Sequence, residues 1–162
     1  ENFLQVPEPL IQKEFSRIMS LKDGSKKMSK SELSDLSRIN LTDDKDLIIN
    51  KIKKAKTDPL PMPNTLKELD ERLEAKNLLG IYSSLTNSTL EKSVENFAGK
   101  NFSEFKQKLS EVLVDKIQPI STEIKKLLDD KSYLDNTLLE GVERANIIAS
   151  KKIKRIKEIV GF

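Results

Sequence analysis

The strongest constraint on the fold is a helical period that covers most of the chain beyond residue 64. From Thr65 to Val160, apolar residues recur at three- and four-residue spacing, which places them on one face of each α-helix. A long helix from Asn101 carries such a stripe past Pro119, which should kink the helix without ending it. A last helix is expected over Tyr133–Val160. We therefore predict antiparallel helices joined by short loops, which is the helical bundle class.

Local start and stop signals mark these helices. Three residue pairs fit the capping box of helix N-termini: Thr65 with Glu68, Ser88 with Glu91, and Asn101 with Glu104. A helix over Leu73–Leu85 follows the first pair and carries Tyr82 on its apolar face, which favours a core position for this ring. Gly99 is placed to stop the helix that follows the second pair.

Residues 1 to 64 differ from the rest in composition, because all but one of the prolines lie there. Alternating polar and apolar residues over Phe15–Leu21 predict one short strand, which Asp23-Gly24 ends. Thr42 is the expected N-cap of a helix that runs to about Lys56. The proline-rich run that follows this helix predicts a stiff connection to the helical part.

The composition excludes several kinds of chemistry. The sequence has no Cys and no His, which removes thiol nucleophiles, disulfides, histidine bases and nearly all transition-metal centres. The net charge of +3 permits a polyanionic partner without arguing for one. No apolar run is long enough to cross a bilayer, and the default compartment is the cytoplasm. The remaining polar groups suit phosphate binding better than hydrolysis.

One segment carries chemistry, Ser20–Ser31, which extends into a polar, lysine-rich loop over residues 25–37. Two of its lysines, Lys27 and Lys30, are three residues apart and are interleaved with the hydroxyl groups of Ser25, Ser29 and Ser31. Ammonium groups, hydroxyls and backbone N–H groups on a loop that can close would form a clamp for a polyphosphate. The same composition is also typical of a solvated surface loop.

The loop resembles a known signature. Lys27-Met28-Ser29-Lys30-Ser31 is the signature pentapeptide of class I aminoacyl-tRNA synthetases, and the rest of the chain resembles the tryptophanyl-tRNA synthetase family. The resemblance extends, in order and spacing, over Val6–Ile11, Arg17–Leu21, Ser37–Asp44, Lys51–Asp58, Asn77–Tyr82, Phe105-Lys106 and Glu140–Asn146. Glu32 stands where bacterial members usually have Asp, which keeps the charge.

This resemblance implies a mainly α fold. It consists of a helical bundle of the anticodon-binding type, preceded by the last strand and the ATP-binding loop of a class I, Rossmann-like nucleotide-binding domain. We expect residues 1–41 to be the end of that catalytic domain, residues 42–64 a linking helix and proline-rich connection, and residues 65–162 the bundle with the C-terminal helix. Class I enzymes carry a second signature that contains histidine, so the resemblance implies that this chain corresponds to the C-terminal half.

The resemblance also implies an activity and the residues that serve it. The family activates tryptophan with ATP, which enters with Mg²⁺ as substrate, and transfers the amino acid to tRNA(Trp). Lys30 would contact the pyrophosphate portion of ATP, with Lys27 in support. Met28, Ser29 and Ser31 would shape the loop near the adenosine and phosphates. Ile18 would place a backbone group against the adenine, although it also reads as a core residue. No protein-bound metal is expected.

The partners follow from the same resemblance, and some points stay open. We expect tRNA(Trp), tryptophan and ATP as partners of a full-length homodimer, and we expect the 162-residue chain alone to be inactive. The basic runs over residues 51–56 and 151–157 could follow an RNA backbone or could simply face solvent. No residue is assigned to reading the tRNA. The alternative function is a non-catalytic RNA-binding or scaffolding helical module.

Overall fold

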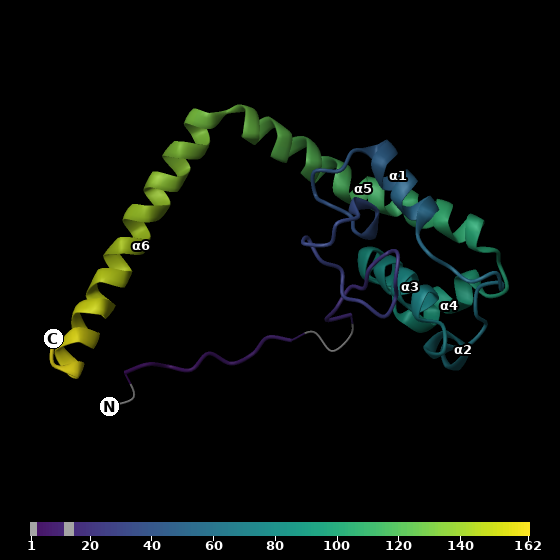
Figure 1. Ribbon diagram of the computed structural model, residues 1–162, viewed down its shortest axis with the longest axis horizontal. Helices are drawn as coiled ribbons and strands as arrows, with labels where there is room; N and C mark the ends of the chain where they lie inside the picture. Colours follow the sequence, from purple (N-terminus) through teal and green to yellow (C-terminus); the bar gives the residue numbers. More distant parts are fainter. Residues whose placement is uncertain (1–2, 12–14) are drawn as a thin grey trace. The chain divides into compact units, whose positions relative to one another are not determined.

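The computed structural model describes residues 3–11 and 15–162, and this part of the chain is mainly helical (Figure 1). The elements are a short 3-10 helix, η1 (Asp35–Ser37), followed by α1 (Lys45–Lys54), α2 (Leu66–Asp70), α3 (Leu73–Thr86), α4 (Leu90–Phe97), α5 (Phe102–Asp129) and α6 (Lys131–Val160). The predicted mainly α class is confirmed. Of the residues assigned to the end of the catalytic domain, 1–2 and 12–14 lie outside the described part.

The short strand predicted over Phe15–Leu21 is not formed as a regular element. Within the described residues, β-pairing is limited to one isolated antiparallel bridge between Met19 and Lys27. Phe15 has a φ of 51°, which is not an extended conformation. A strand gains stability from a ladder with several paired residues, and here the chain turns back at Asp23-Gly24 after a few residues. The predicted turn is therefore present, but the strand is reduced to the arm of a short hairpin.

The chain divides into two compact units, residues 1–120 and 121–162. In the first unit, α1, α3, α4 and the first turns of α5 contribute to one apolar core, and α3 packs against α4 (Figure 1). Leu21 from the hairpin joins the same core. Tyr82, Phe97 and Phe105 form edge-to-face contacts, with ring centroids 5.0 Å apart for Tyr82 and Phe97 and 4.9 Å for Phe97 and Phe105. Tyr82 is partly buried and packs against this core, so its ring faces the apolar side of α3 as predicted.

Two of the predicted helix starts are confirmed. Thr65 Oγ1 accepts a hydrogen bond from Glu68 N at 3.2 Å, and Asn101 Oδ1 accepts one from Glu104 N at 2.9 Å. Gly99, with a φ of +69°, follows the end of α4 as expected. Pro119 lies inside α5, so the helix continues through it.

Two other predicted starts are displaced along the chain. The N-cap of α1 is Asp44 and not Thr42, with Asp44 Oδ1 accepting from Leu47 N at 2.9 Å. The N-cap of α4 is Thr89 and not Ser88, because the Ser88 hydroxyl instead pairs with Thr86 and Ser93. In both places several capping residues are adjacent, and tertiary hydrogen bonds select among them.

The second unit consists of the end of α5 and of α6. Asp130 caps α6 by accepting from Tyr133 N at 2.9 Å, and Gly161 ends the helix with a φ of +88°. No described side chain of α6 is buried, although its apolar stripe has the spacing predicted from the sequence. Across the described residues, no helix is long and apolar enough to pass through a membrane.

Candidate functional site

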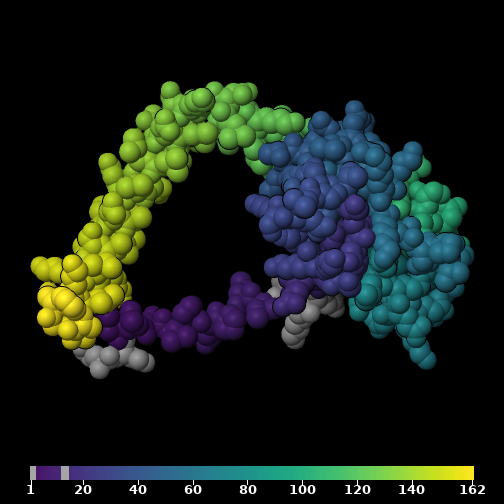
Figure 2. Space-filling model, viewed as in Figure 1, coloured from purple at the N-terminus to yellow at the C-terminus, as the bar shows by residue number. Residues whose placement is uncertain are grey.

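The signature loop, Lys27–Ser31, begins on the returning arm of the hairpin. Ser20 N donates to Lys26 O at 2.8 Å, and Met28 N donates to Ile18 O at 3.0 Å. These backbone bonds on either side of the Met19–Lys27 bridge fix the first two residues of the signature. In the space-filling view, this segment and α1 lie on the visible surface of the first unit (Figure 2).

A buried asparagine of α3 holds the hairpin in place. Asn77 Oδ1 accepts from Met19 N at 2.8 Å, and Asn77 Nδ2 donates to Met19 O at 2.9 Å. Asn77 is only 8% exposed, so this pair of hydrogen bonds forms where water cannot easily replace it. Sequence reasoning missed this role. The sequence feature that could have indicated this role is the single amide side chain, Asn77, within the apolar stretch that forms α3.

The rest of the signature forms a turn, Ser29–Glu32, which we call the signature turn. Ser29 Oγ lies 2.8 Å from Ser31 Oγ and accepts from Ser31 N at 3.3 Å. Lys30 stands at the exposed tip of the turn. The neighbouring Lys26 pairs with Asp23 at 3.4 Å, whereas the ammonium groups of Lys27 and Lys30 have no carboxylate partner among the described residues. Both charges are therefore available to a ligand.

The signature loop borders a cavity of about 560 Å³, which we call the signature cavity. Its lining comes from the hairpin, the loop and the segment before α1: Ser16, Arg17, Ile18, Lys27, Met28, Ser29, Lys30, Arg38, Ile39, Asn40, Leu41 and Thr42. Five of the six predicted site residues thus share one cavity. Ser31 is outside this lining and contacts it through Ser29. The volume is within the range of small-molecule sites, and the two lysines and two arginines of the lining make it positive.

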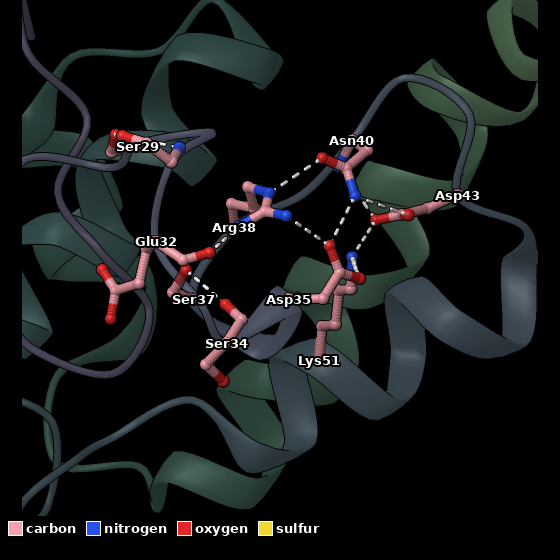
Figure 3. Close-up of polar contacts among 10 residues, drawn as sticks. Ser29, Glu32, Ser34, Asp35, Ser37, Arg38, Asn40, Asp43 and Lys51 are labelled. Atoms are coloured by element: carbon pink, nitrogen blue, oxygen red, sulfur yellow. Dashed lines mark hydrogen bonds and ion pairs between the residues drawn. The ribbon is translucent and has the colours of Figure 1, made fainter.

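A charged network lies beside this cavity (Figure 3). We call it the anchor network, and its members are Asp35, Arg38, Asn40, Asp43 and Lys51. Lys51 Nζ contacts Asp43 Oδ2 at 2.6 Å and Asp35 Oδ2 at 2.7 Å. The Lys51 side chain is fully buried. It therefore cannot contact an RNA backbone, which was one of the two predictions for the basic run over residues 51–56. Hydrogen bonds from Lys51 and then Asn40 lower the pKa of Asp35, which keeps that carboxylate ionised.

The other lysines of that basic run are exposed. Lys53, Lys54 and Lys56 face solvent, and Lys56 pairs with Glu74 at 2.8 Å. A second cavity, of about 900 Å³, lies between α1 and α5 and includes Lys53 and Lys106 in its lining. It contains none of the predicted site residues. The described part of the chain holds no group of three or more acidic, His or Cys side chains placed to bind a metal ion.

Comparisons with known proteins assign the chain to a family. Residues 1–118 match the family described as tRNA synthetases class I (W and Y), and the chain belongs to this family. Similar relatives are named tryptophan--tRNA ligase. The one from Rickettsia felis is 49% identical over 162 residues, and the one from Agrobacterium fabrum is 48% identical over 160 residues. These alignments cover 100% and 99% of this chain but 48% and 45% of the relatives, so the chain spans about half their length.

Solved structures show the same fold. The tryptophanyl-tRNA synthetase of Mycoplasma pneumoniae aligns with a TM-score of 0.75 and 25% identity, over 93% of this chain and 45% of that one. A tryptophanyl-tRNA synthetase from Campylobacter jejuni, complexed with ADP and tryptophan, aligns with a TM-score of 0.68 and 21% identity, over 99% and 48%. Because its sequence identity is only 21%, the second match supports the fold and nothing further.

Proposed function

We propose that this chain is the C-terminal portion of a tryptophan--tRNA ligase. In the first reaction, a carboxylate oxygen of tryptophan bonds to the α-phosphorus of ATP, and pyrophosphate leaves. In the second, the terminal ribose hydroxyl of tRNA(Trp) takes the tryptophanyl group, and AMP leaves. The observation that carries this proposal is the signature loop beside a cavity, in a chain of the class I synthetase family. Within residues 3–11 and 15–162, no carboxylate pairs with the ammonium groups of Lys27 and Lys30.

The roles of the site residues follow from charge. Negative charge builds on the bridging and pyrophosphate oxygens in the transition state, and fixed cations stabilise it. We assign Lys30 to the pyrophosphate portion and Lys27 to its support. Met28, Ser29 and Ser31 shape the loop by their backbone and hydroxyl contacts. Because the Ile18 carbonyl already accepts from Met28 N, we assign the adenine contact to the Ile18 N–H. Mg²⁺ enters with ATP as part of the substrate.

We further propose the division of the chain and its partners. Residues 1–41 end the catalytic domain, residues 42–64 link it to the helical part, and residues 65–162 bind tRNA(Trp). The full-length protein would be a cytoplasmic homodimer, and the 162-residue chain alone would not form adenylate. We also expect the isolated chain to bind ATP weakly at best, and micromolar ATP binding in a calorimetric titration would contradict this. The match over residues 1–118 favours the ligase over a scaffolding module.

The test is ATP–pyrophosphate exchange by the full-length ligase that contains this chain. Lys30→Ala removes a charge-assisted contact made in the transition state, and we expect the exchange rate to fall by about 10²- to 10³-fold. Lys26→Ala is the matched control, because Lys26 is an exposed lysine of the same loop that pairs with Asp23 and does not line the cavity. Equal rates for the Lys30 variant and the control would refute the proposed role of the loop.

A further inference from the structure

The C-terminal end of the signature turn, at Glu32, is held by the side chain of Arg38, which lies outside the signature. Arg38 Nη1 donates a hydrogen bond to the carbonyl oxygen of Glu32 at 2.9 Å. Glu32 is the residue directly after the signature, and its N–H lies 3.5 Å from Ser29 O. The hairpin fixes the loop at Met28, and Arg38 fixes it at Glu32. Lys30 therefore lies on a short span between two anchors.

The guanidinium of Arg38 is itself fixed on its other edges. Its Nη2 contacts Asp35 Oδ1 at 3.0 Å, and its Nε donates to Asn40 Oδ1 at 3.2 Å. Figure 3 shows Arg38 between Glu32 on one side and Asp35 and Asn40 on the other. The planar guanidinium of an arginine can donate hydrogen bonds to three acceptors in one plane. A lysine ammonium at the same position could retain only some of these hydrogen bonds.

The anchor network connects Arg38 to the core of the first unit. Asp35 Oδ2 contacts Lys51 Nζ, and the Asn40 amide donates to Asp35 Oδ1 at 3.0 Å and to Asp43 Oδ1 at 3.2 Å. Lys51 belongs to α1, whose neighbouring side chains Ile48 and Ile52 are fully buried. The Glu32 carbonyl is therefore linked, through Arg38, Asp35 and Lys51, to a helix that belongs to the core.

We propose that Arg38 is a positioning residue for the activation step, which keeps the signature turn in the conformation that presents Lys30 to the phosphates. This inference rests on the proposed function, because it acts through Lys30. Arg38 also lines the signature cavity, and each of its three guanidinium nitrogens contacts one partner, which is Glu32, Asp35 or Asn40. Without the bond to Glu32, the span after Met28 is free to move, and small misplacements of a reacting contact are costly to rate.

The experiment measures ATP–pyrophosphate exchange by the full-length ligase with Arg38→Lys. We expect kcat to fall by about 10- to 100-fold while the KM for tryptophan stays unchanged. The matched control is Arg72→Lys. Arg72 is buried to the same degree, pairs with Asp58 and also donates to a backbone carbonyl, Pro61 O, but lies outside the cavity. The control should lose stability and keep kcat within about twofold.

A double variant separates positioning from a general structural effect. If Arg38 acts through Lys30, Arg38→Lys should cost less than about threefold when Lys30→Ala is already present. An equal loss in both backgrounds, or no loss in the single variant, would overturn the proposal. If Arg38→Lys melts at a lower temperature than Arg72→Lys, Asp35→Asn provides the same test, because Asp35 is half exposed and orients the guanidinium.

The outcome for Lys30→Ala alone distinguishes a failure of the proposed function of the loop from a failure of the positioning role of Arg38. A Lys30 variant with normal exchange would refute the proposed function of the loop, whatever Arg38 does. A slow Lys30 variant together with a normal Arg38→Lys variant would refute only the positioning role.

Discussion

Lys51 is the residue whose replacement tests the anchor network most severely. Lys51→Met keeps the long apolar stem within α1 and removes the ammonium group that contacts Asp43 at 2.6 Å and Asp35 at 2.7 Å. Asp43 is then left 4% exposed and without a cation, with hydrogen bonds from Asn40 still in place. The variant therefore isolates the effect of one uncompensated buried charge.

The expected cost follows from the burial of the two carboxylates. Removing one partner of a buried ion pair typically costs about 3–5 kcal/mol. Asp35 is 48% exposed, so its lost pairing with Lys51 adds little to this cost. We expect Lys51→Met to destabilise α1 by about 3–5 kcal/mol in total. Lys51→Met combined with Asp43→Asn should recover at least half of this loss, because it removes the buried charge as well.

The cost should also depend on pH. The Lys51 hydrogen bond is the largest cause of the lowered pKa of Asp35, so ionised Asp35 favours the folded state. That contribution is present above the pKa of the unfolded group, about 3.9, and is lost as the pH falls through the lower folded value. Lys51→Met removes it at neutral pH, so the stability difference between the two proteins should narrow below about pH 4.

Native-state hydrogen exchange of the α1 amides in the full-length protein measures this local stability. We expect exchange to accelerate by about 10²- to 10³-fold in Lys51→Met. In Lys54→Met, which changes an exposed lysine of the same helix, exchange should change by less than about threefold. Equal protection in the two variants would refute the role of the buried pair. A double variant as unstable as Lys51→Met would show that the charge left on Asp43 is not the cause.

Three further predictions concern the scaffold of the first unit. Asn77→Ala should cost about 1–3 kcal/mol in thermal unfolding, because both backbone groups of Met19 lose their partner, and an unchanged melting temperature would contradict this. Phe105→Ala should cost about 3–5 kcal/mol in the same assay, since the ring is fully buried against Phe97, and a loss below 1 kcal/mol would argue against this packing. Thr65→Ala should cost about 1 kcal/mol, seen as faster amide exchange confined to α2, and exchange in α2 that matches the parent protein would exclude the cap.

Much of the helical architecture could be predicted because it is encoded locally. The apolar period and the capping pairs at Thr65 and Asn101 placed α2, α3 and α5 close to their observed bounds. The predicted N-cap of α1, Thr42, lies two residues before the observed one, Asp44, which accepts from Leu47 N. Asp43, between them, instead accepts hydrogen bonds from Lys51 and Asn40. Such a choice depends on contacts that a local pattern does not contain.

The residues of the site also fall into two groups, those that a local sequence pattern reveals and those that only tertiary contacts bring together. The signature loop is a contiguous pattern, so its residues could be named from the sequence, although their roles stay predictions. The anchor network is assembled from η1, the segment before α1 and α1 itself, and Lys51 was grouped with solvent-facing lysines. A signal was available: Lys51 stands three residues after Ile48, on the apolar face of the helix. A lysine on that face needs a buried carboxylate partner.

We propose that Lys30 stabilises the transition state of tryptophan activation, and single-turnover kinetics of the full-length ligase measure that step. The measurement compares the rate of tryptophanyl-adenylate formation at saturating ATP in the full-length ligase with that in Lys30→Ala, together with the affinity of each for tryptophan. We expect Lys30→Ala to form the adenylate about 10²- to 10³-fold more slowly, with tryptophan affinity unchanged within about twofold. An unchanged rate of adenylate formation would contradict it.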